Sequence, residues 1–231
     1  MHRLSREALA LHFRALVNIE RGEIFGPADA AYRPINLPED SATMFAGFVG
    51  PNCESGNCLI LAINPGGGGD AYTERTNEDE HFYPLLQGFK ASTDHEVLTT
   101  FEAINTAFMP IVQKWNLWRI LGPTLEATRQ SVDQVTYMNV VPYRTREDKT
   151  PPVAAQRIAW GRIVAPTIAL LQPRALIALG KKADKLVRRW HTGSESYFCV
   201  PRTIGDTYVS AEAEQVLARI RSEFPAVVEG R

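Results

Sequence analysis

The sequence predicts an α/β fold, a three-layer αβα sandwich with a central four-stranded parallel sheet. Three observations predict it. Short apolar runs typical of buried strands occur near residues 59–63, 135–141, 175–179 and 197–200, and longer amphipathic stretches separate them. This alternation favours parallel strands covered by helices on both faces. The first run also ends in four consecutive glycines, Gly66 to Gly69, and α/β sheets bind ligands beyond the carboxyl ends of their strands.

Length and composition indicate one core domain with an extension. The chain has 231 residues, of which 45% are hydrophobic, so it can bury a substantial core. We expect a helical extension at residues 1–57 that packs on a core domain at residues 58–231. No apolar run approaches the roughly 20 residues of a membrane span. The N-terminus also lacks a signal-peptide pattern, so we expect a cytoplasmic monomer without membrane contact.

The three cysteines bear on metal and redox chemistry. Cys53, Cys58 and Cys199 cannot all pair with one another, which is typical of a reducing compartment. They could hold an iron–sulfur cluster only with a fourth ligand, and no second pair has metal-ligand spacing. We therefore expect neither a metal nor another cofactor.

The elements of the first half follow from caps, spacing and breakers. Ser5 is expected to cap a helix that runs to about Arg21, and glycines and prolines then make residues 22–38 irregular. A short apolar piece at 44–48 leads into the first strand. Residues 70–84 are expected to form a polar loop, whose length favours a functional role, with a solvated insertion as the alternative.

The second half alternates more regularly. Helices are expected from about 93 to 108, around Trp115 and Trp118, and from Thr150 to about Leu171 with an irregularity at Pro166. We interpret the tryptophans as core residues. A basic helix at 181–190 follows the third strand, and an amphipathic helix at about 211–224 follows the fourth.

The end of the first strand is the main candidate for a site. It delivers one polar side chain, Asn64, and a bare glycine loop to one point. Glycines let a ligand approach the backbone, and such turns can direct several N–H groups at an anion. A tight turn that needs glycine for its shape is the other interpretation. The stretch has neither the Gly-x-Gly-x-x-Gly register of a dinucleotide site nor the Lys-Ser/Thr of a P-loop.

Four short motifs, taken in order, resemble the uracil-DNA glycosylase superfamily. They are Ile63-Asn64-Pro65-Gly66, Met138-Asn139-Val140-Val141, Ala178-Leu179-Gly180-Lys181-Lys182-Ala183, and a loop at Pro201 after the last strand. The likeness covers about residues 59–220, and its INPG form is most similar to the mismatch-specific and single-strand-selective branches. It implies that Asn64 positions the attacking water and that the loop after the last strand enters the DNA minor groove.

The chemistry of base excision suits these residue types. Excision breaks the bond from C1′ to the base, through an oxocarbenium-like sugar and a departing base anion, after the target leaves the helix. The Asn64 amide oxygen can orient a water beneath C1′. Backbone N–H groups near Gly66 and Gly67 can bind the oxygen of the leaving base. Asn139 can read the polar edge of a pyrimidine, although capping a turn is an alternative role.

Other residues are assigned to base and DNA contacts. Phe82 or Tyr83 can stack on the base or serve as core anchors. DNA contacts are expected for Arg144, Lys181, Lys182, Lys185, Arg202 and Ile204. The window 137–202 holds 12 basic against 4 acidic residues, which favours a polyanion-binding face, with solvated helix faces as the alternative.

Two departures from the superfamily bear on the reaction. The chain reads Val200-Pro201-Arg202 where many relatives have His-Pro-Ser, so the usual leaving-group histidine is missing. Arg202 could instead contact a phosphate or the base anion, and Ile204 could fill the vacated stack. The glycine tract also stands where uracil-specialised relatives place a bulky aromatic residue.

These features predict a monofunctional DNA glycosylase that flips out and hydrolyses a pyrimidine nucleotide, leaving an abasic site. The base is uracil or mismatched thymine or, given the open glycine loop, a 5-substituted cytosine such as the glucosylated hydroxymethylcytosine of phage DNA. Asp70 and its acidic neighbours are good acceptors for sugar hydroxyls, which favours a role in phage defence. The alternative is a catalytically silent member of the same fold that binds nucleic acid or a nucleotide.

Overall fold

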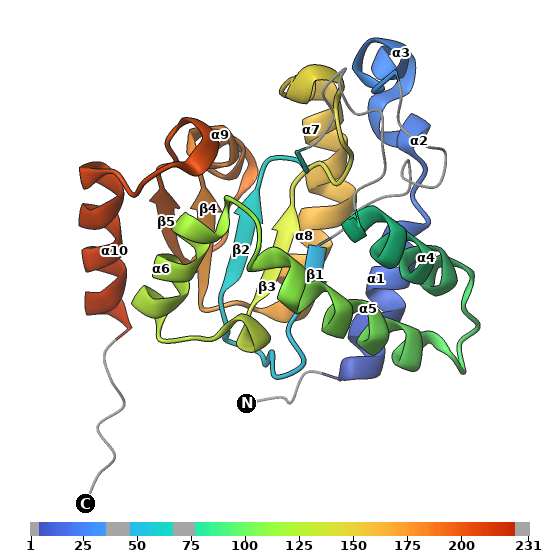
Figure 1. Ribbon diagram of the computed structural model, residues 1–231, viewed down its shortest axis with the longest axis horizontal. Coiled ribbons are helices and arrows are strands. Elements are labelled where there is room, and N and C mark those ends of the chain that lie inside the picture. Colours follow the sequence, from blue (N-terminus) through green and yellow to red (C-terminus); the bar gives the residue numbers. More distant parts are fainter. Residues whose placement is uncertain (1–4, 36–46, 67–76, 225–231) are drawn as a thin grey trace, which may run out of the picture.

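The α/β prediction is confirmed by a computed structural model (Figure 1). It describes residues 5–35, 47–66 and 77–224, and for residues 77–81 the backbone alone. The strands form one sheet of order β1-β3-β2-β4-β5. Four of them are parallel, namely β2 (Leu59–Ala62), β3 (Thr136–Asn139), β4 (Ala175–Leu179) and β5 (Ser196–Val200).

A fifth strand, β1 (Gly47–Val49), extends the expected sheet of four. It pairs antiparallel with β3, with Gly47 opposite Met138. Only glycine fits there, since a Cβ on Gly47 would lie 1.9 Å from the Tyr137 carbonyl oxygen and φ is +105°. Three residues are too few to show an alternating pattern, so the sequence indicated only an apolar piece at 44–48. Residues 1–57 thus contribute a strand to the sheet of residues 58–231.

The N-terminal helices differ in detail from the expectation. Helix α1 (Arg6–Val17) begins at Ser5, whose hydroxyl accepts a hydrogen bond from the Ala8 amide, but it ends before Arg21. Short helices then occupy the segment expected to be irregular, namely α2 (Arg21–Phe25), η1 (Gly26–Ala28) and α3 (Asp29–Tyr32). Leu9 and Phe13 of α1 are buried against the rest of the protein.

The expected loop at 70–84 is partly wrong, because helix α4 (Asn77–Ala91) begins inside it. Pro84 lies within this helix, and its polar first turn hid the helical pattern. Burial of Phe82, Tyr83 and Phe89 supports it instead. Helices α5 (Val97–Val112) and α6 (Trp118–Thr128) follow. In Figure 1, α5 and α6 lie in front of the strands and α8 lies behind them.

The remaining elements match the expected order. Short turns η3 (Val132–Gln134) and η4 (Arg146–Asp148) flank β3. The long helix comprises α7 (Val153–Ala159), a π-helical segment η5 (Trp160–Val164) and α8 (Ala165–Leu171). The π segment ends two residues before Pro166, which lacks an N–H. Helix α9 (Lys181–Trp190), η6 (Ile204–Asp206) and α10 (Ala211–Glu223) complete the described chain.

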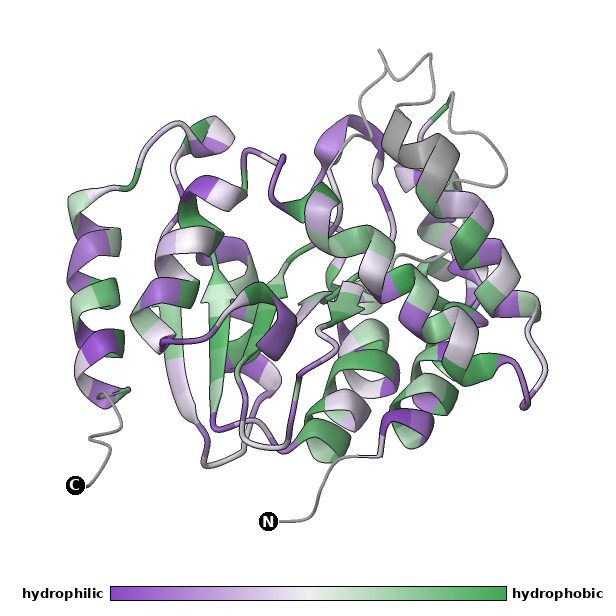
Figure 2. Ribbon diagram, turned by 60° about the horizontal axis from the view of Figure 1, so that its bottom comes forward, coloured by the Kyte–Doolittle hydropathy of each residue, from purple (hydrophilic) through white to green (hydrophobic). Residues whose placement is uncertain are grey.

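Burial follows hydropathy through these layers. Every residue of β2, β3 and β4 is buried. Figure 2 shows hydrophobic strands at the centre and hydrophilic residues on the outer helix surfaces. No helix in the described part of the chain is long and apolar enough to cross a membrane. Because the parallel strands point the same way, the segments after β2, β3, β4 and β5 meet at one edge of the sheet.

Candidate active site

A cavity of about 860 Å³ lies at this edge, beyond the carboxyl ends of the parallel strands. Its wall includes most of the predicted site residues, namely Asn64, Gly66, Phe82, Tyr83, Asn139, Arg144, Lys181, Lys182, Arg202 and Ile204. Lys185 is exposed on α9 and does not line it. Gly67 and Asp70 lie outside the described residues. Side chains far apart in the sequence therefore share one cavity, since Asn64 and Ile204 both line it.

The Asn64 amide is held by its nitrogen. Nδ2 donates to the Thr145 hydroxyl at 3.1 Å and to the Pro65 carbonyl at 3.2 Å. Thr145 is fully buried, and its own hydroxyl donates to the Lys149 carbonyl at 2.5 Å. Because its one proton is committed to that carbonyl, the Thr145 oxygen can only accept from Asn64. The amide orientation is therefore determined, with Oδ1 on the remaining side.

The Asn64 oxygen is available as an acceptor. No described residue donates a hydrogen bond to Oδ1, and Asn64 is partly exposed in the cavity wall. An amide oxygen held in this way can accept a hydrogen bond from a water molecule and fix its position without removing a proton.

Asn139 presents a second acceptor from the next strand. It is the last residue of β3, opposite Ala62 of β2 in the sheet register, and it is 1% exposed. Its Oδ1 is buried and has no hydrogen-bond partner among the described residues. Buried polar atoms are nearly always paired, and an exception in a cavity indicates a ligand or ordered water as the missing partner.

Aromatic side chains form the apolar part of the wall. Phe82 and Tyr83 meet edge to face with ring centroids 6.0 Å apart, and the ring centroids of Phe82 and Phe108 are 5.2 Å apart. Trp115 continues the wall, 5.2 Å from Phe108. Phe82 and Tyr83 thus line the cavity and also belong to the core, where each is 5% exposed. The two roles proposed for them are compatible.

Tyr137, two residues before Asn139, also lines the cavity. Its ring stacks on Phe48 at an interplanar angle of 20°. Burial raises the pKa of Tyr137 above its ordinary value, so the phenol stays protonated at neutral pH and can donate a hydrogen bond.

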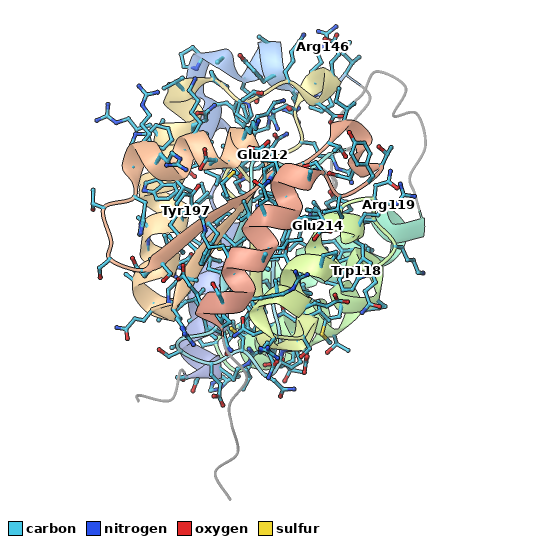
Figure 3. The ribbon with its side chains drawn as sticks, turned by 90° about the vertical axis from the view of Figure 1, so that its left-hand side faces the viewer. Trp118, Arg119, Arg146, Tyr197, Glu212 and Glu214 are labelled. Carbon is cyan, nitrogen blue, oxygen red and sulfur yellow. The ribbon has the colours of Figure 1, made fainter. Side chains whose placement is uncertain are left out.

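Basic side chains line another part of the cavity. Lys181 and Lys182 begin α9, directly after Gly180, and both are exposed. Lys181 pairs with Glu212 at 3.3 Å, and Figure 3 shows Glu212 near the start of α10, beside α9. The Arg144 guanidinium lies 5.9 Å from the centre of the Tyr83 ring. Three of the predicted DNA-binding residues, Arg144, Lys181 and Lys182, therefore contribute basic side chains to the cavity wall.

Arg202 has a different position from the other basic residues. Its Nε donates to Oδ1 of Asp206 at 2.8 Å, and its Nη2 donates to Oδ2 of the same carboxylate. Burial lowers the pKa of an arginine, but the hydrogen bonds and charge of Asp206 outweigh this effect and raise the pKa of Arg202. The predicted contact of Arg202 with a phosphate or base anion must therefore compete with an intramolecular ion pair.

Ile204 is exposed at the edge of the cavity. Its exposed fraction is 98%, although isoleucine is usually buried. Gly205 and Asp206 have φ of +69° and +51°, and this left-handed turn presents the side chain outward. The predicted role of Ile204 as a wedge requires an exposed apolar side chain of this kind.

Three site residues were missed by sequence reasoning. Thr145 acts through a turn in which Glu147 and Asp148 have positive φ without being glycine, and no sequence signal indicates such a turn. Tyr137 sits within a predicted strand, and no separate role was predicted for it. Asp206 pairs with Arg202 at a spacing of four residues outside a helix, where the i,i+4 rule gives no expectation. Of the three, only Tyr137 could have been indicated by the sequence, because the alternation of side chains along β3 places it on the same face as Asn139.

The cysteines do not form a metal site with described neighbours. All three are free thiols, and Cys53 and Cys58 are buried. Burial raises the pKa of Cys58 to about 12. Among the described residues no group of three histidine, cysteine or acidic side chains could hold a metal ion.

Comparison with known proteins does not assign the chain to a family. No family model matches it, and no curated protein matches its sequence. The cavity and the side chains that line it are therefore the basis for assigning a function.

Proposed function

We propose that this protein is a monofunctional DNA glycosylase of the uracil-DNA glycosylase type, which flips a pyrimidine nucleotide into the cavity and hydrolyses its glycosidic bond. The observation that carries the proposal is the pair of amides in one cavity. Asn64 has a fixed orientation and an unpaired oxygen, and Asn139 has a buried unpaired oxygen. Neutral acceptors suit a reaction whose electrophile is a cationic sugar.

In the proposed reaction, Asn64 Oδ1 accepts a hydrogen bond from a water below C1′. The bond between C1′ and the base nitrogen breaks, and its electron pair leaves with the base. The water oxygen bonds to C1′ and releases a proton to solvent, and the base anion takes up a proton. N–H groups near Gly66, which lines the cavity, would stabilise that anion before it is protonated. The product is an abasic site.

Asn139 would recognise the base before this step. Its unpaired Oδ1 can accept a hydrogen bond from a ring N–H or an exocyclic amino group. Phe82 and Tyr83 would contact the flipped base from the apolar wall. Leaving a buried acceptor unpaired costs about 1–3 kcal/mol, so a base that offers a donor at this point is selected.

The volume of the cavity supports a large substrate. Its 860 Å³ falls in the range of sites that enclose drug-sized ligands, well beyond a bare pyrimidine ring. We therefore include 5-substituted cytosines, such as glucosylated hydroxymethylcytosine of phage DNA, with uracil and mismatched thymine as candidate substrates. Phage defence in the cytoplasm, by a monomer bound to DNA, is the corresponding biological role.

One observation supports a second function, a catalytically silent DNA-binding protein. No histidine is among the described residues that line the cavity, so none of them can act as the leaving-group acid of many relatives. The basic side chains and the exposed Ile204 would serve binding in either case.

Base release from defined duplexes tests the proposal. The panel carries uracil, mismatched thymine, 5-hydroxymethylcytosine and its glucosylated form, and abasic sites are detected by alkali cleavage. We expect cleavage of at least one duplex by the wild-type protein and none by Asn64→Ala. Tight, salt-dependent binding without any cleavage would establish the silent protein, and release of uracil alone would exclude the large-substrate version.

A further inference from the structure

We propose that Arg202 and Asp206 are positioning residues that hold the loop carrying Ile204 in one place relative to the start of α9. The pair would keep the wedge and the DNA-binding lysines in a constant relative position. The inference rests on the proposed function in one respect, because Ile204 is taken to enter the DNA base stack.

The ion pair closes the loop on itself. Two N–H groups of Arg202 bind both oxygens of Asp206, and the enclosed segment contains Ile204. Asp206 is 4% exposed, so the pair is shielded from water on the acidic side. The Thr203 hydroxyl donates to the Tyr208 carbonyl at 3.0 Å and closes the loop a second time. A forked arginine–carboxylate pair fixes orientation as well as distance, which a single contact does not.

The Arg202 stem also packs against the turn before α9. A Cβ placed on Gly180 would lie 3.2 Å from Cδ of Arg202, and the Gly180 amide donates to the Val200 carbonyl at 2.8 Å. Gly180 directly precedes Lys181 and Lys182. The loop with the wedge and the turn with the lysines are therefore in contact through one side chain.

A third support comes from α6. Nη1 of Arg119 donates to the carbonyls of Asp206 and Thr207, each at 3.4 Å. Figure 3 shows Arg119 on α6, next to this loop. The loop is thus held from α6 and from the turn before α9, while Ile204 stays 98% exposed. A preordered wedge avoids the entropy cost of ordering a loop when DNA binds.

This arrangement changes the role of Arg202. Its charge is paired with a buried carboxylate, so it adds little to the attraction of a phosphate. Lys182, by contrast, has no ion pair among the described residues. Arg202 therefore organises the surface that the lysines present.

The test measures unstacking directly, with a duplex that carries 2-aminopurine next to the target base. The fluorescence of 2-aminopurine rises when the Ile204 side chain separates it from the neighbouring base. We expect Asp206→Asn to lower the rise and to slow single-turnover base release about three- to tenfold, the cost of one or two newly mobile side chains. Equilibrium binding at low salt should change less than twofold, which separates positioning from affinity.

Glu212→Gln is the matched control. It removes the same negative charge from an exposed pair with Lys181, and its fluorescence rise should equal that of the wild type. Removing a negative charge favours DNA binding, so weaker unstacking in Asp206→Asn has the opposite sign to an electrostatic effect. Arg202→Lys keeps the charge and loses the fork, and we expect it to reproduce the defect if Asp206→Asn does not fold.

Ile204→Ala identifies the residue through which the pair acts. It should abolish most of the fluorescence rise, and adding Asp206→Asn should then have almost no further effect. Full unstacking by folded Asp206→Asn and Arg202→Lys, or independent effects of the two sites, would overturn the inference. If base release is normal in both Asp206→Asn and Arg202→Lys, the positioning inference is overturned and the proposed function is not. If the wild-type protein unstacks DNA without releasing any base, only the proposed function is refuted.

Discussion

Two asparagines, each 1% exposed, occupy different regions of the molecule and are satisfied differently. Asn105 of α5 uses both ends of its amide, since Oδ1 accepts from the Val49 amide at 2.7 Å and Nδ2 donates to the Phe101 carbonyl at 2.8 Å. Asn139 of β3 leaves its Oδ1 without a partner among the described residues. The two amides therefore differ in hydrogen-bond satisfaction and not in burial, and only the oxygen of Asn139 can accept a hydrogen bond from a ligand or an ordered water.

The largest effect is expected at Asn64, a third asparagine, which is partly exposed in the cavity wall. Asn64→Ala should lower base release about 100- to 1,000-fold, the usual cost of removing one preorganised polar group at a reacting centre. DNA affinity, measured by fluorescence anisotropy, should stay within about twofold, because the nitrogen contacts only the protein in the free state. Undiminished turnover would refute a water-positioning role.

The two buried asparagines should respond in opposite ways to leucine. Asn139→Leu should lower kcat/KM about 10- to 100-fold, since a donor on the base loses a partner worth about 1–3 kcal/mol. Its melting temperature should change little, because no described group depends on the lost oxygen.

Asn105→Leu is the matched variant. It leaves the buried Val49 amide unpaired and should cost about 1–3 kcal/mol of unfolding free energy, measured with urea. Base release by the folded fraction should remain normal. A stability loss at Asn139 equal to that at Asn105 would break the comparison.

A smaller effect is expected at Thr145, whose hydroxyl accepts a hydrogen bond from the Asn64 nitrogen and leaves the Asn64 oxygen unpaired among the described residues. Thr145→Val keeps the shape and removes the acceptor, so kcat should fall about three- to tenfold with KM unchanged, the value of one neutral hydrogen bond. Thr145→Ser should restore the rate. Lys149→Ala is a control, because only the Lys149 carbonyl takes part. Equal rates in Val and Ser variants would mean that Thr145 does not orient the amide.

The smallest effect on chemistry is expected from the lysines, which contribute charge and no hydrogen-bonding pattern. Replacing Lys181 and Lys182 by Gln should reduce the slope of log affinity against log salt by about 2 while base release at saturation is unchanged. Lys185→Gln should change the slope less, since Lys185 does not line the cavity. An unaltered slope in the double variant would place the start of α9 away from DNA.

The sequence predicted the parts of the fold and site that depend on local pattern. The apolar runs around Leu59 and Ala175 indicated buried strands, and Asn64 and Asn139, which follow two such runs, were both predicted to be site residues. The start of α4 was missed because the first turn is polar and its support comes from tertiary burial of Phe82.

The unpredicted parts depend on backbone shape. Whether Arg202 meets a phosphate or Asp206 is decided by a left-handed turn at Gly205 and Asp206. The orientation of Asn64 is likewise decided by a turn that brings the Lys149 carbonyl to Thr145. Neither turn has a residue pattern that indicates its conformation in advance.

Strand β1 has a consequence for how far the chain can be shortened. It covers the edge of β3, and its own outward Val49 amide is taken by Asn105. Without residues 47–49, β3 would present a row of open backbone groups to other molecules, and exposed edges of this kind promote self-association into aggregates. We therefore expect a chain shortened to begin at Cys58 to aggregate, because it would lack β1, the strand that pairs with the edge of β3 opposite β2.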